Sequence, residues 1–303
     1  MIIFNIYIYI LMSDEKNCIF IGSVVFRKSC DVYSLKDNGN YIDDINFNIL
    51  NDYNLIYIKT DYLKDFYNNL DRLTKKIILV SGCSDYTIPN DIMHNDDFEK
   101  LLNNEKIIHF YAQNCIYKNP KITNLPIGLD YHTMSKYNIY WGNIKSPIEQ
   151  ENELLEIQKI MKPFYERQVK IYSNCHFFVN TKFGYDRTDA LNNISKEILF
   201  LEPNQVDRKT SWNKQINYSF VLSPHGNGLD CHRTWEALVL GCIPIVKKSL
   251  IDDLYKDLPV LIVDDWSEIN MDLLVNIIKQ FKNINFNYKK IELKYWIDNM
   301  KTY

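Results

Sequence analysis

The residues best suited to chemistry gather in one stretch of the chain, residues 222–249, LSPHGNGLDCHRTWEALVLGCIPIVKKS. Glycine in a loop lets the backbone take positive φ and lets a ligand lie against the main chain without meeting a Cβ atom. A helix that begins directly after such a loop offers unpaired N–H groups and partial positive charge. The loop therefore predicts an anion site, most naturally for a phosphate, and its candidate ligands are His225, Gly226, Asn227 and Gly228.

The helix predicted over residues 230–240 adds two groups of complementary chemistry. Arg233 and Glu236 are three residues apart, so they share one face of this helix. A guanidinium suits phosphate oxygens, and a carboxylate one turn away suits the paired hydroxyls of a ribose. Asp230 is expected to cap the first turn, and Gly241 is expected to end the helix in a left-handed cap. The alternative is an ordinary strand, turn and helix in which Arg233 and Glu236 form a surface ion pair.

Strands and helices are predicted to alternate along the chain, because short β-branched or apolar runs are separated by segments with helical spacing. In the first half, strands are expected at 18–26, 54–59, 76–80, 106–110 and 122–127, and helices at 62–73, 95–104 and 148–162. After Pro163, strands are expected at 169–179, 217–222, 243–246 and 260–263, and helices at 188–199, 205–215, 230–240, 268–282 and 288–300. This alternation favours an α/β fold of two doubly wound, Rossmann-like domains that face each other across a cleft.

The composition argues against several classes of protein. The net charge is −3 and the Lys pairs are scattered, so no nucleic-acid partner is expected. Seven cysteines without a Cys-x-x-Cys pair argue against a disulfide framework or a zinc ribbon, and they favour a reducing, cytoplasmic location. The apolar opening MIIFNIYIYILM is too short to span a bilayer, so no integral membrane segment is predicted. Heavy use of Asn, Ile, Lys and Tyr is typical of an AT-rich genome; in a large DNA virus the location would be the host cytoplasm or a viral factory.

The segment FVLSPHGNGLDCHRTWEALVLGCIPIV resembles the donor-binding segment of exostosin-like glycosyltransferases. The pattern of that family runs Phe-x-Leu-x-Pro-x-Gly, then Arg-x-x-Glu-Ala-Leu, then Gly-Cys-Ile-Pro-Val. The matching positions in this chain are Phe220, Leu222, Pro224, Gly226, Arg233, Glu236, Ala237, Leu238, Gly241, Cys242, Ile243, Pro244 and Ile245. Weaker similarity extends over residues 78–266, through LVSGCSDYTIP, YAQNC, PKITNLPIGLDYHT and WGNIKSPIEQENELL.

The resemblance implies the two-domain glycosyltransferase architecture called GT-B. It implies an acceptor-side domain at residues 1–163, a nucleotide-sugar domain at 164–285, and a last helix within 286–303 that crosses back to the first domain. It also implies transfer of a sugar from a nucleoside-diphosphate donor, expected to be a UDP-sugar, to a glycan or glycoprotein acceptor. The transfer is expected to be inverting and to need no metal or other cofactor. In agreement, the chain has no Asp-x-Asp, the pair with which metal-dependent glycosyltransferases hold the cation of the donor.

Without a metal, charge that develops on the leaving diphosphate must be met by Arg233 and by the N-terminus of its helix. Asn180 and Arg187 follow the strand predicted at 169–179, so they are expected at the same edge of the sheet, where they could close over the diphosphate.

Inversion also needs a general base on the first domain, opposite the leaving group. Asp85 follows the strand at 76–80 and is the first candidate, with Asp130 and His132 as the alternative pair after the strand at 122–127. Each of these residues could instead be a helix cap or a turn residue.

Two other functions fit the same motif. A nucleotide-sugar epimerase of the same architecture would bind the donor and need no acceptor. A non-catalytic copy would bind nucleotide or glycan without turning the donor over.

Overall fold

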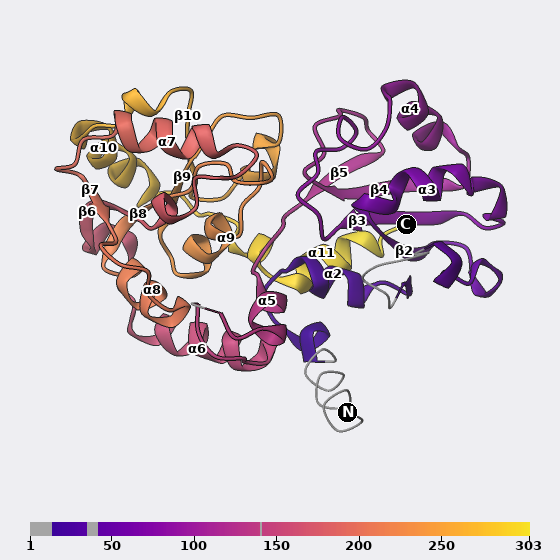
Figure 1. The fold of residues 1–303 in the computed structure, drawn as a ribbon, viewed down its shortest axis with the longest axis horizontal. Coiled ribbons are helices and arrows are strands. Elements are labelled where there is room, and N and C mark those ends of the chain that lie inside the picture. Colours follow the sequence, from indigo (N-terminus) through magenta and orange to yellow (C-terminus); the bar gives the residue numbers. More distant parts are fainter. Residues whose placement is uncertain (1–13, 35–41, 140) are drawn as a thin grey trace.

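The computed structural model describes residues 14–34, 42–139 and 141–303, so the apolar opening at residues 1–12 lies outside the described residues. Two five-stranded sheets, all of whose strand pairs are parallel, form the centre of two domains (Figure 1). The first sheet has the order β1 (Val32–Tyr33), β2 (Asn54–Lys59), β3 (Ile77–Gly82), β4 (Ile107–Gln113) and β5 (Ile122–Leu125). The second has the order β10 (Leu261–Val263), β9 (Ile243–Lys247), β8 (Tyr218–Leu222), β6 (Gln168–Ser173) and β7 (Leu199–Leu201).

The α-helices cover both faces of each sheet. Their bounds are α2 (Ser23–Ser29), α3 (Leu63–Asn68), α4 (Asn95–Asn103), α5 (Tyr131–Lys136), α6 (Pro147–Ile160), α7 (Gly184–Asn193), α8 (Arg208–Gln215), α9 (His232–Val239), α10 (Met271–Phe281) and α11 (Leu293–Met300). Successive strand side chains point to opposite faces. In β8, accordingly, Val221 packs with the α8 and α9 side while Phe220 and Leu222 pack with the α7 and α10 side. The predicted α/β fold class, two Rossmann-like doubly wound domains, is confirmed.

The prediction of a strand over residues 18–26 is wrong. Phe20 and Gly22 each form only an isolated bridge, and the apolar residues that follow begin α2. A short apolar run fits a buried strand or a buried helix equally well, and its neighbours in three dimensions decide. Here the neighbour is α11, from the other end of the chain, which packs against α2.

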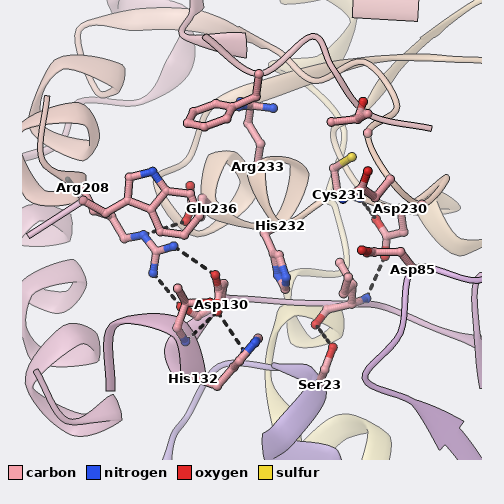
Figure 2. A pocket seen from close by; sticks show the side chains of 18 of the residues that line it. Ser23, Asp85, Asp130, His132, Arg208, Asp230, Cys231, His232, Arg233 and Glu236 are labelled. Carbon is pink, nitrogen blue, oxygen red and sulfur yellow. Dashed lines mark hydrogen bonds and ion pairs between the residues drawn. The ribbon is translucent and has the colours of Figure 1, made fainter. Parts of the chain in front are cut away.

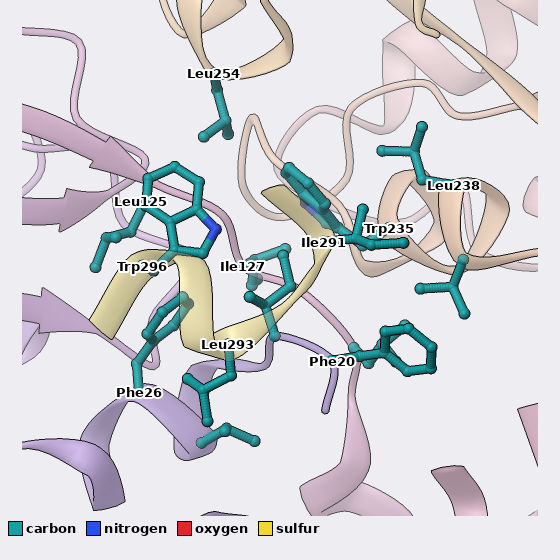
Figure 3. Close-up of a cluster of buried hydrophobic side chains, with 14 of the residues drawn as sticks. Phe20, Phe26, Leu125, Ile127, Trp235, Leu238, Leu254, Ile291, Leu293 and Trp296 are labelled. Atoms are coloured by element: carbon teal, nitrogen blue, oxygen red, sulfur yellow. The ribbon is translucent and has the colours of Figure 1, made fainter. Parts of the chain in front are cut away.

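A continuous apolar core joins the two domains (Figure 3). It contains Ile127 from the first domain, Trp235 and Leu238 from α9 of the second, and Trp296 from α11. All four are at most 5% exposed. The two sheets therefore do not have wholly separate interiors.

The last helix lies beside the first domain although it follows the second in sequence (Figure 1). The backbone N–H of Leu293 donates to the carbonyl of Ile19 at 2.8 Å, and the Tyr111 hydroxyl donates to the carbonyl of Asn299 at 3.3 Å. Within the described ranges, no helix combines the length and the apolar character that a bilayer span requires.

Candidate active site

A cavity of about 760 Å³ is lined by residues of both domains (Figure 2). The first domain contributes the end of β2 and the turn after β3, and the second contributes the residues that follow β6 and β8. Strand order in the second sheet reverses between β6 and β8. Ligands of doubly wound folds bind outside the carboxyl ends of the strands at such a reversal. The cavity therefore occupies the position at which this topology predicts a ligand.

The loop after β8 exposes Gly226 and Gly228 to the cavity, but neither has positive φ. The positive φ predicted for these two glycines is therefore wrong. Glycine fits here because neighbouring side chains lie too close to leave room for a Cβ atom. A Cβ atom on Gly226 would collide with the guanidinium of Arg187, and one on Gly228 would lie 2.9 Å from the side-chain nitrogen of Asn114. By contrast Gly241 has φ +64°, so the predicted left-handed cap at the end of α9 is confirmed.

Two of the predicted ligand residues do not line the cavity. His225 is buried, with its N–H 2.9 Å and its Nδ1 3.2 Å from Asp186, because this carboxylate holds the loop toward the interior. Trp266 fixes the same carboxylate by donating from Nε1 at 2.7 Å. Asn180 is exposed and lies outside the lining, whereas Asn227 lines the cavity. The contribution of His225 is thus to hold the loop rather than to face a ligand.

Asp230 does not cap the first turn of α9 as predicted. The helix begins at His232, and no side chain caps its start. Asp230 instead lies in the interior, 1% exposed, where it accepts hydrogen bonds from the Ile127 N–H at 2.7 Å, Trp235 Nε1 at 2.9 Å and the Tyr255 hydroxyl at 3.1 Å. Because Ile127 belongs to the first domain, this carboxylate ties the two domains together at the base of the cavity. Burial raises the pKa of Asp230 to about 6.

Two guanidinium groups face the cavity at the loop after β8. Arg233 donates from Nε to the side-chain oxygen of Asn174 at 3.0 Å, and Arg187 donates to the carbonyls of His225 and Phe178. Burial and the neighbouring charge of Arg233 lower the pKa of Arg187. Among the described residues, no carboxylate forms an ion pair with either guanidinium. Two cations held close together without a counter-ion among the described residues are a candidate anion site.

Glu236 forms an ion pair with a third guanidinium, that of Arg208, rather than with Arg233. Its Oε1 lies 3.6 Å from Nε of Arg208, the first residue of α8. Arg208 also crosses to the first domain, where it donates to the carbonyl of Asp130 at 2.5 Å, lies 3.4 Å from the carboxylate of Asp130, and reaches Gln150 at 3.3 Å. The central carbon of its guanidinium, Cζ, lies over the ring of Trp141, 4.7 Å from the ring centre. The predicted surface pair of Arg233 with Glu236 does not form among the described contacts.

Asp130 and His132 form a hydrogen-bonded pair at the wall of the cavity (Figure 2). Oδ1 of Asp130 lies 2.9 Å from Nδ1 of His132, and it also accepts from the Thr133 N–H at 3.1 Å, so Asp130 caps α5 as well. Burial alone would raise the pKa of Asp130, but the hydrogen bond to His132 and the charges of His132, His232 and Arg208 hold it well below its usual value. Asp130 is therefore a poor proton acceptor and a good orienting group for the half-exposed imidazole of His132.

Asp85 lines the same cavity on the turn after β3, and it is exposed. Among the described residues, none donates a hydrogen bond to its carboxylate. All three candidate bases thus line the same cavity. They differ in their hydrogen bonds: Asp130 orients His132, whereas no described residue orients the carboxylate of Asp85.

Sequence reasoning missed Asn174, Asp186 and Arg208. Asn174 directly follows β6, and this position at the carboxyl end of a strand was a usable signal. Arg208 follows the helix cap Asp207, but nothing in the sequence indicates that it reaches Asp130 in the other domain. Within the described part of the chain, no group of three or more His, Cys, Asp and Glu side chains is placed to hold a metal ion.

No protein-family model matches the chain, and no curated protein matches it. Among solved structures, the chain is similar to one described as "Trehalose-6-phosphate from E. coli bound with UDP-2-fluoro glucose". The identity is 11% and the TM-score is 0.40, over 84% of this chain and 75% of that chain.

Proposed function

We propose that this protein is a glycosyltransferase that moves a sugar from a nucleoside-diphosphate donor, a UDP-sugar, to a glycan or glycoconjugate acceptor. The observation that carries this proposal is the pair of guanidiniums, Arg187 and Arg233, at the strand reversal of the second sheet, where no described carboxylate forms an ion pair with either of them. A diphosphate supplies the negative charge that this site lacks, and the uncapped start of α9 adds N–H groups beside it.

The donor is proposed to lie along the second domain. Its diphosphate contacts Arg187, Arg233 and the loop around Gly226, and its ribose hydroxyls face Glu236. Glu236 lies 3.6 Å from Arg208, and both side chains line the cavity. The diphosphate is a better leaving group when its developing charge is stabilised, so these cations contribute most of the rate. We infer that the reaction needs no metal.

The acceptor is proposed to enter from the first domain. His132 takes the proton of the acceptor hydroxyl, the oxygen attacks the anomeric carbon, and the bond from that carbon to the diphosphate oxygen breaks with inversion. Asp130 stabilises the protonated imidazole, and Arg208 holds Asp130 ionised and in place. Asp85 stays the alternative base, because it lines the same cavity.

The exostosin-like resemblance supports the same assignment in finer detail. Its positions Arg233 and Glu236 line the cavity, and Gly226 lies at its wall. Gly241 adopts the left-handed conformation that ends α9, which is consistent with the place of glycine in that pattern.

The test is binding and turnover of nucleotide sugars by the full chain. UDP and a panel of UDP- and GDP-sugars are screened by thermal shift, where a ligand at 100 times its Kd adds about 2.7 kcal/mol to the unfolding free energy. We expect UDP and one UDP-sugar to stabilise the protein, and slow release of UDP from that sugar without an acceptor. Conversion of the sugar to an epimer would identify an epimerase instead. Stabilisation with no release of UDP, even with acceptor pools present, would identify a non-catalytic copy.

A further inference from the structure

His232 lines the cavity, and the proposed reaction gives it no role. It is the first residue of α9 and directly precedes Arg233. Figure 2 shows its side chain reaching from that helix toward the first domain, where Asp130 and His132 lie. The centres of the His132 and His232 rings are 6.5 Å apart. A side chain of the second domain therefore lies beside the proposed base.

The backbone of the first domain sets the orientation of the His232 ring. Its Nδ1 lies 2.6 Å from the carbonyl oxygen of Gly128. A carbonyl oxygen only accepts hydrogen bonds, so Nδ1 must carry the proton of this contact, and in the neutral imidazole Nε2 then holds the lone pair. Among the described residues, none hydrogen-bonds Nε2. Nor is Nε2 one of the polar atoms that the described chain buries without a partner, so it is accessible from the cavity as an acceptor.

The loop that holds this ring is itself fixed. Gly128 has φ +66°, and a Cβ atom there would lie 2.4 Å from the carbonyl oxygen of Ile21, so the position requires glycine. The Ile127 N–H donates to Asp230 at 2.7 Å, and the Leu129 N–H donates to the carbonyl of Ile21 at 2.8 Å. Because both neighbours of Gly128 are hydrogen-bonded, the direction of its carbonyl is fixed, and the imidazole that donates to it is fixed as well.

The proposed reaction determines which part of the substrates lies beside this ring. In an in-line displacement, the anomeric carbon lies between the leaving diphosphate oxygen and the attacking oxygen. Arg187 and Arg233 are proposed to hold the diphosphate, and His132 is proposed to hold the acceptor hydroxyl. The transferred sugar therefore occupies the space between them, which His232 borders. A nitrogen that only accepts matches a hydroxyl, which donates, and it does not match a phosphate oxygen.

We propose that His232 is a specificity-determining residue whose Nε2 accepts a hydrogen bond from one hydroxyl of the transferred sugar. The favoured donor has a free hydroxyl at that position, and a donor with hydrogen, fluorine or an ether there loses the hydrogen bond. This inference rests on the proposed glycosyltransferase function, because it assigns a contact to the donor of the same cavity.

The test is calorimetry on the full chain with UDP, UDP-glucose, UDP-galactose and UDP-N-acetylglucosamine. The nucleotide sugar that binds best is then compared with analogues in which fluorine replaces one sugar hydroxyl at a time, because fluorine cannot donate a hydrogen bond. We expect one analogue to bind about three- to ten-fold more weakly than its parent, the range of a neutral hydrogen bond. Equal binding of every analogue overturns the proposal, and this series needs no variant that must fold.

Two substitutions separate the two nitrogens of His232. The amide nitrogen of asparagine replaces Nδ1 and keeps a donor for Gly128, whereas glutamine places its amide at Nε2. In His232→Asn, affinity for the parent donor should fall about three- to ten-fold, UDP affinity should stay within about two-fold, and the sensitive analogue should bind as its parent does. His232→Gln should retain part of the discrimination. His94→Asn, at an exposed histidine outside the cavity lining, is the matched control and should behave as the unmodified chain.

The other outcomes are distinguishable. Equal loss of UDP affinity in His232→Asn would assign the residue to the diphosphate and overturn the proposal. Slower transfer with unchanged affinity for the donor would make His232 the base, which overturns it as well. Unaltered affinity and rate would show that His232 only ties the domains together, and the proposed function would stand. If the unmodified chain binds no UDP-sugar, the proposed function fails and this inference fails with it.

Discussion

Arg233→Ala should separate the binding of a diphosphate from the stability of the fold. In the absence of ligand, Arg233 has one described hydrogen bond from its guanidinium, to Asn174, and it lies close enough to the like charge of Arg187 to lower the pKa of that group. Removing it relieves a repulsion and breaks one neutral contact. We therefore expect the unfolding free energy of the ligand-free protein to stay unchanged or to rise slightly.

The loss of UDP affinity follows from the same geometry. A hydrogen bond to a charged group contributes about 1.5–3 kcal/mol, and a guanidinium that faces a diphosphate makes the charge-assisted kind. Arg187 stays in place and retains part of the attraction. We expect the affinity for UDP to fall by about 2–3 kcal/mol, which is roughly 30- to 150-fold in Kd.

Calorimetric titration with UDP and thermal unfolding without ligand measure the two quantities on one preparation. Arg72→Ala is the control, because Arg72 is an exposed arginine outside the cavity lining and should leave UDP affinity unchanged. An Arg233→Ala protein that binds UDP as tightly as the unmodified chain would refute the assignment of the anion site. A protein that loses stability with its UDP affinity intact would show that Arg233 is structural.

Three further predictions concern the rest of the cavity. His132→Gln should lower the rate of transfer about 10²- to 10⁴-fold in steady-state assays with UDP affinity unchanged, and a normal rate would return the base role to Asp85. Gly226→Ala should weaken UDP binding in calorimetry, because the added methyl group meets the Arg187 guanidinium, and unaltered binding would place the diphosphate elsewhere. Asp230→Asn should remove a destabilisation that grows between pH 4 and 6, because the folded pKa of Asp230 is raised from 3.8 to about 6 and its contribution to the unfolding free energy falls by about 3 kcal/mol as pH rises through this window. The lowered pKa of His109 contributes with the opposite sign over the same range, so the quantity to measure is the difference between the variant and the unmodified chain at each pH, and a difference that stays constant from pH 4 to 6 would contradict the reasoning.

The sequence predicted local structure where the signal is local. The strand, loop and helix from β8 to α9 follow from an apolar run, two glycines and a helical spacing, and Gly241 ends the helix as expected because only a residue without Cβ takes that conformation readily. The alternation of strands and helices was likewise sufficient for the fold class. Even so, the positive φ expected at Gly226 is not found, and the side chain that crowds it, Arg187, is too distant in sequence to have been predicted.

What could not be predicted depends on contacts between distant segments. Residues 23–29 form a helix rather than a strand because α11 packs against them, and no local pattern reveals that neighbour. Arg208 was overlooked because its hydrogen-bond partner, Asp130, lies 78 positions earlier in the sequence, in the other domain. Asp230 has the residue type of a helix cap, yet in the fold its carboxylate oxygens accept hydrogen bonds from Ile127 and Trp235.

The apolar core that joins the domains has a consequence for how this protein can be divided (Figure 3). A cut between the two sheets would separate Trp235 and Leu238 from Ile127, and all of these side chains would then be exposed to water. Large exposed apolar surfaces of that kind promote aggregation. Neither half is then an exchangeable module, so chimaeras that graft the second domain onto a foreign partner must carry the terminal helix and its contacts with them. Heating should likewise melt the chain in one transition, because the halves share the side chains that stabilise them.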